Sequence, residues 1–415
     1  MKAIKVKLYL NSEQISYINN LLGCSRFVYN NCLDFKIKYY NETNKSTSFG
    51  ELGKHLTGLK QKYTWLKDVH SKVLQQSLIN LEYAYKNFFK NGMGFPNFKK
   101  KSQKQSCRFP VDAISGVNGN RINLIRQLKD IHYKCSRRDE KLLNKYQDLI
   151  KSATLTKSKS GNYNLSILID IKSVKKLPKT DKVIGIDLGI KDFVITSDNQ
   201  TFENIKTKRN NQKKLVKLNR NLSKKVKGSN NKTKARIKLA KFHEKLNNKK
   251  ENYLHLISNQ LLNENQVIVM EDLNVKGMLK NHNLAKSIQE LSLNRFKTLL
   301  TYKSEWYGRD LIEIGRFYPS SKTCSCCGYK NQDLTLKDRT FKCPECNVSI
   351  DRDYNAAINI RNEGIRLFKI NCNNFKEVTY NEEIGLSSPE LTSMDSSGYT
   401  LEEVEKEGKI RVVIN

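Results

Sequence analysis

Two pairs of closely spaced cysteines constrain the fold of this chain more strongly than any other feature of its sequence. Cys324 and Cys327 form one pair, Cys343 and Cys346 form the other, and 15 residues separate the pairs. The two-residue spacing lets each pair lie on a tight turn, so that two turns present four thiolates to one tetrahedral zinc ion. Because four thiolates leave no open position for water, we expect a structural zinc ribbon.

The other six cysteines are scattered along the chain (Cys24, Cys32, Cys107, Cys135, Cys326 and Cys372). This arrangement favours a reducing compartment and a single metal site over a disulfide framework. Cys326 and Cys327 are adjacent in the sequence, and both can bind one ion only through a strained turn. We therefore expect Cys324 and Cys327 to be the ligands of the first pair.

The charge balance of the chain indicates a polyanionic partner. Its 415 residues include 75 Lys and Arg against 41 Asp and Glu, which gives a formal net charge of +34. Nucleic acid is the expected partner, because phosphate neutralisation supplies most non-specific affinity. An anionic membrane is the rival, but the sequence contains no apolar run of about 18 residues. The first residues alternate like a strand rather than forming a signal peptide, so we expect an intracellular protein.

Two periodicities divide the N-terminal part of the chain. Residues 1–10 alternate as a strand does, and residues 150–172 alternate around Gly161 and Asn162 as a hairpin does. Residues 11–104 between them predict helices. One apolar stripe in this region has the 4-3-4-3 spacing of a helix face that packs in a core (Leu74, Leu78, Leu81, Tyr85 and Phe88).

Two basic segments are candidates for nucleic-acid contact. Phe95 and Phe98 precede three lysines, and such rings either stack on bases or only anchor a solvated loop. Residues 206–250 contain 18 Lys or Arg against one acid, and leucine spacing suggests two basic amphipathic helices joined near Gly228. This imbalance is too large for a salt-bridged surface. The candidate contacts are Phe95, Phe98, Lys99, Lys100, Lys101, Lys213, Lys217, Arg220, Lys224, Lys225 and Arg236.

Three carboxylates occupy positions typical of a metal-dependent active site. Apolar strands over residues 183–187 and 266–271 end at Asp187 and Glu271, and Asp353 opens a predicted helix. These side chains can meet at one edge of a sheet, where clustered like charges persist if cations bridge them. Two Mg²⁺ ions held there could activate water and stabilise the leaving oxygen of a phosphodiester.

Each carboxylate also has a plainer interpretation. Asp187 precedes a glycine and can be a turn residue, Glu271 can lie on the surface, and Asp353 can be a helix cap. Around these positions the sequence further predicts a strand at Asp192–Thr196, a helix over about 283–308 and a strand at Leu311–Ile314. Core candidates in that helix are Leu291, Phe296, Leu299, Leu300 and Trp306.

The order of these motifs resembles the TnpB (OrfB) family, whose members are encoded by insertion sequences and are related to compact type V CRISPR effectors. The resemblance covers roughly residues 1–363 and is most specific after residue 183. It rests on the segments Gly185–Gly189, Val269–Leu273, Ser320–Cys324 and Asp351–Ala357, on the cysteine pairs, and more loosely on Gly94–Lys99.

The resemblance implies an α/β multidomain fold. It implies a RuvC-like, ribonuclease-H-type nuclease domain (residues 177–321 and 349–370) with an inserted zinc ribbon (322–348). A small β-barrel wedge domain (1–10 and 105–176), interrupted by a helical recognition region (11–104), would precede it. Residues 371–415 lie beyond the motifs, and their acidic composition predicts a poorly ordered tail.

The resemblance also implies an RNA-guided DNA endonuclease that uses magnesium. Asp187, Glu271 and Asp353 would be its catalytic acids, with Asp353 preferred over Asp351 because the family residue directly precedes the x-Asn-Ala stretch. The partners would be a guide RNA from the end of the element and target double-stranded DNA beside a short recognition motif. We expect the protein in the prokaryotic cytoplasm, on the nucleoid when bound to DNA.

Two other functions remain open on the sequence. A transposase, or a transposase accessory protein, could join DNA strands with the same two-metal chemistry. A non-cleaving RNA-guided regulator could bind DNA only, although all three acids are present and relatives of that kind have lost them.

Overall fold

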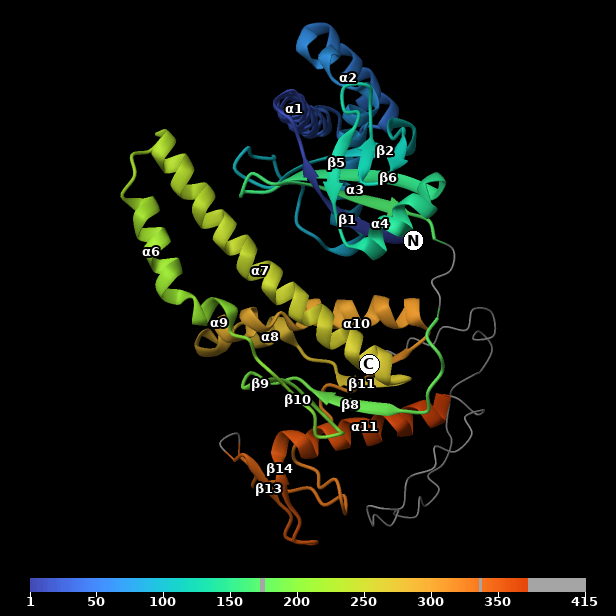
Figure 1. Ribbon diagram of the computed structural model, residues 1–415, viewed down its shortest axis with the longest axis vertical. Helices are drawn as coiled ribbons and strands as arrows, with labels where there is room; N and C mark the ends of the chain where they lie inside the picture. Colours follow the sequence, from blue (N-terminus) through green and yellow to red (C-terminus); the bar gives the residue numbers. More distant parts are fainter. Residues whose placement is uncertain (172–175, 336–337, 372–415) are drawn as a thin grey trace. The chain divides into compact units, whose positions relative to one another are not determined.

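A computed structural model describes residues 1–171, 176–335 and 338–371, and the acidic tail expected after residue 371 lies outside them. The described residues divide into two compact units, one drawn from the ranges 1–172 and 217–244 and the other from the ranges 173–216 and 245–415. Each unit is built around its own β-sheet (Figure 1). The α/β class predicted from the sequence is confirmed.

The first unit contains a seven-stranded antiparallel sheet. Its strands are β1 (Lys2–Tyr9), β2 (Gln105–Pro110), β3 (Gly116–Asn118), β4 (Arg121–Asn123), β5 (Ile131–Lys134), β6 (Ile150–Lys157) and β7 (Tyr163–Ile169), in the order β2-β6-β7-β1-β5-β4-β3. Every second residue of β1 is buried, as its alternation predicts. The hairpin predicted around Gly161 is confirmed as the antiparallel pair β6 and β7, with Gly161 at φ 88°.

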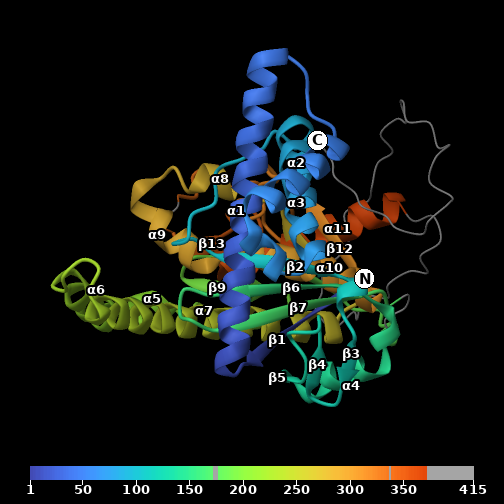
Figure 2. The ribbon, with the colours of Figure 1, turned by 90° about the horizontal axis from the view of Figure 1, so that it is seen from above.

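Helices accompany this sheet. They are α1 (Ser12–Thr43), α2 (Phe49–Lys62), α3 (Ser71–Asn91) and α4 (Arg137–Lys145), with the short 3₁₀ helices η1 (Thr64–Asp68), η2 (Val111–Ala113) and η3 (Gln147–Leu149). Capping boxes at Asn11 and Ser48 begin α1 and α2. Helices α1 and α3 pack on each other and on β2 (Figure 2), and the predicted stripe buries Leu74, Leu78 and Leu81 there.

The lysine-rich segment forms helices, as predicted. After the short α5 (Thr207–Asn210) come α6 (Gln212–Ser223) and α7 (Asn230–Glu264). The turn between α6 and α7 contains Gly228 at φ 87°, a left-handed conformation that glycine adopts without a steric penalty. Helix α7 continues to Glu264, beyond the basic segment, because its second half turns apolar and buries residues such as Leu254 and Leu261.

The second unit contains a five-stranded mixed sheet. Its strands are β8 (Val183–Asp187), β9 (Asp192–Thr196), β10 (Thr201–Glu203), β11 (Val267–Glu271) and β12 (Asp310–Ile314), in the order β10-β9-β8-β11-β12. Strands β8, β11 and β12 are parallel, whereas β9 returns antiparallel beside β8 and β10 pairs antiparallel with β9. The strands predicted at 183–187, 192–196, 266–271 and 311–314 are therefore confirmed.

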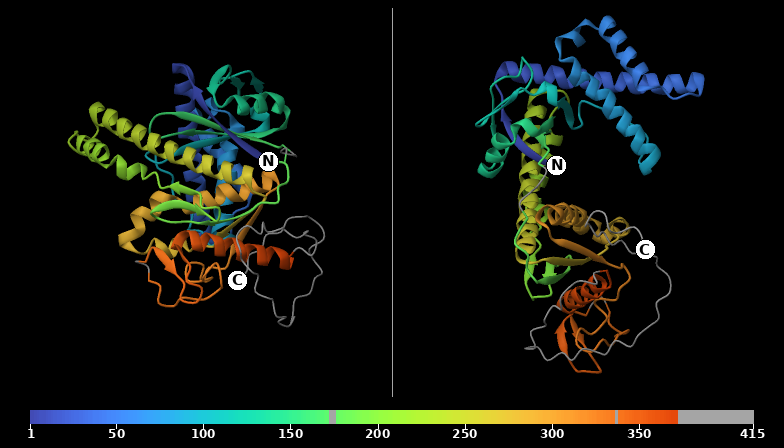
Figure 3. Two further views of the ribbon diagram at one scale, coloured as in Figure 1. Left: turned by 60° about the horizontal axis from the view of Figure 1, so that its bottom comes forward. Right: turned by 90° about the vertical axis from the view of Figure 1, so that its right-hand side faces the viewer.

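Helices cover both faces of this second sheet. Ile184 and Ile186 belong to a core shared with α7 and with α10 (Leu293–Tyr307), whereas Val267 and Val269 pack with residues of α11 (Arg352–Asn371). The short strands β13 (Thr340–Lys342) and β14 (Ser349–Asp351) pair antiparallel and contact α11 (Figure 3). Since parallel strands buried on both faces read as apolar runs, the layering explains the sequence of β8 and β11.

The single helix predicted over 283–308 is wrong. The short α8 (Val275–Met278) is followed by two helices, α9 (His282–Leu291) and α10, which are separated at Ser292 in the left-handed conformation at φ 58°. Lys250 Nζ fixes this break by donating to Ser292 Oγ at 2.6 Å and to Glu290 O at 3.1 Å. Of the predicted core residues in this region, only Trp306 is not fully buried, and its ring packs on Tyr302 with centroids 4.7 Å apart.

Candidate active site and metal centre

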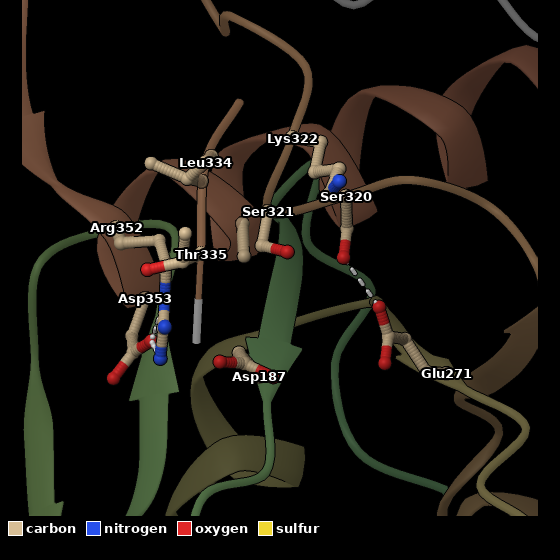
Figure 4. A pocket seen from close by; sticks show the side chains of 10 residues that line it. Asp187, Glu271, Ser320, Ser321, Lys322, Leu334, Thr335, Arg352 and Asp353 are labelled. Carbon is tan, nitrogen blue, oxygen red and sulfur yellow. Dashed lines mark hydrogen bonds and ion pairs between the residues drawn. The ribbon is translucent and has the colours of Figure 1, made fainter. Parts of the chain in front are cut away.

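The three predicted carboxylates line one pocket in the second unit. Asp187 ends β8, Glu271 ends the adjacent parallel strand β11, and Asp353 lies in the first turn of α11. Carboxyl ends of parallel strands lie at the same edge of a sheet, which is why residues 84 positions apart meet. The cavity measures about 400 Å³ and is also lined by Ser320, Ser321, Lys322, Leu334, Thr335, Arg352 and Ala356 (Figure 4).

Two glycines allow α11 to approach the sheet closely. A Cβ atom on Gly185 would overlap the carbonyl oxygen of Ala357 and lie 2.5 Å from the amide nitrogen of Arg361. A Cβ atom on Gly364 would likewise overlap the side chain of Val269. Because Gly185 stands two residues before Asp187, the close contact at this glycine brings the beginning of α11 to the pocket.

The surroundings in the pocket shift the pKa of two of its carboxylates. Burial, followed by the charges of Glu271 and Asp353, raises the pKa of Asp187 to about 7. Burial also raises the pKa of Glu271, and a hydrogen bond that Ser320 Oγ donates to Glu271 Oε1 at 2.5 Å opposes the shift. A divalent cation among these oxygens would offset both the burial and the mutual repulsion, so the donor set fits Mg²⁺.

Asp351 and Asp353 have different surroundings. Asp351 Oδ1 accepts hydrogen bonds from the backbone N–H groups of Asp353 at 2.9 Å and Tyr354 at 3.1 Å, as a helix-capping side chain does. Asp353 instead lines the pocket, where its Oδ1 accepts from Arg352 Nε at 3.0 Å and Nη2 at 2.7 Å. The capping role that the sequence left open for Asp353 is therefore filled by Asp351.

The four predicted zinc ligands form a second cluster. One thiol or thiolate sulfur from each of Cys324, Cys327, Cys343 and Cys346 lies within 4.8 Å of the others. The Sγ atoms of Cys324 and Cys346 are 3.6 Å apart, and those of Cys327 and Cys343 are 3.5 Å apart. Sulfur atoms at about 2.3 Å from a tetrahedral ion would be separated by roughly 3.8 Å, so the cluster fits zinc.

Turn geometry within the cysteine segment agrees with this assignment. Gly328 and Asn347, the residues directly after each pair, have left-handed backbones at φ 79° and 57°. Their amides donate to the carbonyl oxygens of Cys324 and Cys343, both at 3.0 Å, which closes two equivalent turns. Cys326 is exposed and is not a member of the cluster.

The aromatic and lysine segment before β2 is partly anchored. The ring of Phe95 packs edge-on against Tyr85 and Phe88, with centroids 5.6 and 5.4 Å away, yet 46% of the residue is exposed. Phe98 is 47% exposed, and the neighbouring Lys99, Lys100 and Lys101 are also exposed. Phe95 therefore contributes to the anchoring of the loop, as does Lys99, whose Nζ lies 3.6 Å from the centroid of the Tyr29 ring. The Phe98 ring, Lys100 and Lys101 are accessible to a ligand.

Helices α6 and α7 separate apolar from basic side chains. Leu215 is buried and Leu218 and Leu222 are half-buried. The six basic candidates on and between these helices are all exposed (Lys213, Lys217, Arg220, Lys224, Lys225 and Arg236). The amphipathic pattern predicted from the sequence is thus present, with the charges available to an anionic partner.

Sequence reasoning missed several residues of the pocket and its support. Ser320, Lys322 and Arg352 line the cavity, and Asn355 and Asn359 are almost fully buried on α11. One signal was present. Buried asparagines four residues apart on an otherwise apolar helix face require hydrogen-bond partners, so they pointed to a backbone segment held against α11.

Parallel strands that end in carboxylates, next to a four-cysteine cluster, define an α/β protein suited to holding metal ions. Family models match three parts of the chain: "Helix-turn-helix domain" at residues 1–45, "Probable transposase" at 166–282 and "Cas12f1-like, TNB domain" at 294–360. The structure describes all of residues 1–45, and they form β1 and the single helix α1 rather than two helices joined by a turn.

Relatives match most of the chain. "Putative RNA-guided DNA endonuclease" of Streptomyces pristinaespiralis is 32% identical over 367 residues, which cover 88% of this chain and 89% of that protein. "Putative RNA-guided DNA endonuclease InsQ" of Escherichia coli (strain K12) is 30% identical over 377 residues, covering 87% and 91%. Other relatives are named TnpB-like. The chain belongs to the TnpB (OrfB) family.

A solved structure shares the fold. The Cas12f1 chain in a "Cas12f1-sgRNA-target DNA complex" aligns with a TM-score of 0.54 at 16% identity, covering 84% of this chain and 83% of that one. Among the helices that the structure describes, none is long and apolar enough to cross a membrane.

Proposed function

We propose that the protein is an RNA-guided DNA endonuclease that hydrolyses phosphodiesters with two Mg²⁺ ions. The observation that carries this proposal is the meeting of Asp187, Glu271 and Asp353 in one pocket from three separate elements. The family membership supports it, since relatives covering most of the chain bear that name. A guide RNA and target double-stranded DNA are the partners that the net charge of +34 suits.

The carboxylates would hold the metal ions, which would supply an activated water and stabilise the leaving oxygen. The basic side chains of the pocket would bind the substrate. Lys322 and Arg352 line the same pocket, where their positive charges would attract a phosphate of the substrate. The pairing of Arg352 with Asp353 fixes the orientation of one carboxylate. The four-cysteine cluster would hold structural zinc.

The domain assignment follows the same proposal. The five-stranded sheet with α11 is the RuvC-like nuclease domain (177–321 and 349–370), and the cysteine segment (322–348) is its inserted zinc ribbon. The seven-stranded sheet corresponds to the wedge barrel (1–10 and 105–176), and α1 to α3 correspond to the recognition region (11–104). The exposed basic and aromatic candidates would contact RNA or DNA, in the prokaryotic cytoplasm.

The test uses protein co-expressed with its own downstream genomic flank. Bound RNA is sequenced, and the complex is incubated with Mg²⁺ and plasmids that carry a guide-matched target beside randomised bases. We expect cleavage of matched plasmids only, with complete loss in Asp187→Asn and no change in Asp181→Asn, which removes an exposed carboxylate six residues upstream.

Other outcomes separate the remaining functions. If the unmutated complex binds matched DNA but does not cleave it, the protein is an RNA-guided regulator and not a nuclease. If the protein joins DNA ends and contains no bound RNA, it is a transposase. Cleavage that persists in Asp187→Asn would remove Asp187 from the active site.

A further inference from the structure

A buried hydrogen-bond network connects the four-cysteine cluster to the carboxylate pocket. It begins at Glu271, whose Oε1 accepts the hydroxyl of Ser320 at 2.5 Å. Only 7% of Ser320 is exposed, so water does not readily take the place of this donor. Ser320 stands four residues before Cys324, the first cysteine of the cluster.

Two asparagines on α11 hold the segment between Ser320 and the cluster. Asn359 Nδ2 donates to the carbonyl oxygen of Ser320 at 2.8 Å and to that of Thr323 at 2.6 Å. Asn355 Nδ2 donates to the same oxygen of Thr323 at 2.7 Å. Asn355 is 0% exposed and Asn359 is 4% exposed. Breaking these hydrogen bonds would leave buried polar groups unpaired, which raises the free energy of the folded state.

The same network reaches into the first cysteine turn. Asn355 Oδ1 accepts the backbone N–H of Ser325 at 2.9 Å, and Ser325 follows Cys324. One amide group therefore holds the residue on each side of this cysteine, Thr323 through its carbonyl and Ser325 through its N–H. Cys324 is itself buried at 2% exposure. The cluster and the two asparagines therefore hold the backbone from Ser320 to Ser325 in place from both sides.

We propose that Ser320 is a positioning residue for Glu271. Through Asn355 and Asn359, the four-cysteine cluster in turn fixes the backbone that carries Ser320. The cluster thus acts on the carboxylate pocket as well as on the fold, by holding one carboxylate oxygen in the orientation that suits a metal ion. This inference rests on the proposed function, because it takes Glu271 as a metal ligand.

The first experiment measures metal binding rather than cleavage alone. In Ser320→Ala we expect Mn²⁺ to bind the pocket about 10–100-fold more weakly in titrations followed by electron paramagnetic resonance, the range typical of lost supporting hydrogen bonds. Zinc content by mass spectrometry, thermal midpoint and nucleic-acid affinity should stay unchanged. The cleavage rate should fall while the KM for DNA holds, and Ser320→Thr, which keeps the hydroxyl, should recover both properties.

A matched control and a second variant complete the test. Ser349→Ala removes an exposed hydroxyl from β14, directly after the cysteine segment, and should change nothing. Asn359→Ala should weaken Mn²⁺ binding as Ser320→Ala does, because it removes the hydrogen bonds to the backbone of Ser320 and Thr323. The protein should still contain zinc, because the four cysteines are unchanged. If it folds poorly, the same titration on zinc-depleted unmutated protein tests this connection, with weaker Mn²⁺ binding expected.

The failures are distinguishable. If Ser320→Ala binds Mn²⁺ as the unmutated protein does, while Glu271→Gln does not bind it, the positioning role is wrong and the proposed nuclease site stands. If Glu271→Gln also binds Mn²⁺ normally, Glu271 is no ligand and the proposed function loses its site.

Discussion

At the scale of the residue, Asp187 is the group whose chemistry depends most on its surroundings. Burial and the neighbouring carboxylates raise its pKa to about 7 in the metal-free protein. A metal ion binds the ionised carboxylate, so below pH 7 binding must also expel a proton. Metal binding at this pocket should therefore strengthen as the pH rises through 7.

We expect the apparent affinity for Mg²⁺ to fall by up to about tenfold for each pH unit below 7, the limit for release of one proton. Calorimetric titrations in buffers of different ionisation enthalpy would measure the proton released, which should approach one per site at pH 6. Asp187→Asn should abolish this release. Binding at pH 6 without proton release would show that Asp187 is already ionised.

Asp351 and Asp353 offer a second test at this scale. Asp353→Asn should abolish cleavage, because Asp353 lines the pocket. Asp351→Asn should retain cleavage and change stability by less than about 0.5 kcal/mol, because Asp351 caps α11 through Oδ1 and asparagine caps a helix equally well. Rates and urea unfolding of both variants decide the matter, and loss of cleavage in Asp351→Asn with an intact fold would reverse the assignment.

Sequence patterns identified the three carboxylates but not what supports them. Asp187 and Glu271 could be predicted because each ends an apolar strand. Ser320 lies in a segment without periodicity, and its bond to Glu271 spans 49 positions of the sequence. Nothing local in the sequence specifies such a contact, so only the fold reveals it.

At the scale of the element, the pocket depends on how closely α11 packs on β8. We expect Gly185→Ala to lower the free energy of unfolding by about 1–3 kcal/mol, because the added methyl group overlaps the backbone of α11. Gly315→Ala is the matched control, since a Cβ there meets nothing within 4 Å, and it should stay within about 0.5 kcal/mol. Equal stability of the two variants in urea would contradict the close contact.

The cysteine segment gives a prediction of its own. Cys343→Ser should lower bound zinc and the thermal midpoint together, because metal binding contributes to the folding of such small segments. Cys326→Ser, at an exposed cysteine outside the cluster, should keep both values. Mass spectrometry and calorimetry provide the measurements, and unchanged zinc in Cys343→Ser would rule out the four-cysteine site.

Element boundaries were less predictable than element types. The strands of the second unit follow from their apolar runs, whereas the break between α9 and α10 does not. Ser292 adopts a left-handed backbone without glycine, and the contacts of Lys250 from α7 hold it there. A helical periodicity continues across the break. The position of the break is therefore set by a tertiary contact and not by the local sequence pattern.

At the scale of the whole molecule, the excess of positive charge should govern binding. We expect the logarithm of the nucleic-acid affinity to fall linearly with the logarithm of salt concentration. Replacing Lys217, Arg220 and Arg236 with Gln should reduce the slope by roughly 2–3, if each contacts one phosphate. The charge-preserving variant Lys217→Arg, Arg220→Lys and Arg236→Lys should keep it, and an unchanged slope in the Gln variant would remove α6 and α7 from the interface.

The composition predicted this partner class, but not the arrangement of two units or the segments each contains. Residues 217–244 group with the first sheet although they lie between two strands of the second. Such an excursion leaves no compositional boundary, since basic residues run across both of its ends.

The position of α11 in the chain has a consequence for biosynthesis. The helix supplies Asp353, which follows Asp187 by 166 residues, and it also supplies both asparagines that hold Ser320. A ribosome therefore translates both strand carboxylates and all four cysteines before the pocket can close. Nascent chains, and products of premature termination before α11, would carry two of the three acids and could not cut the genome that encodes them.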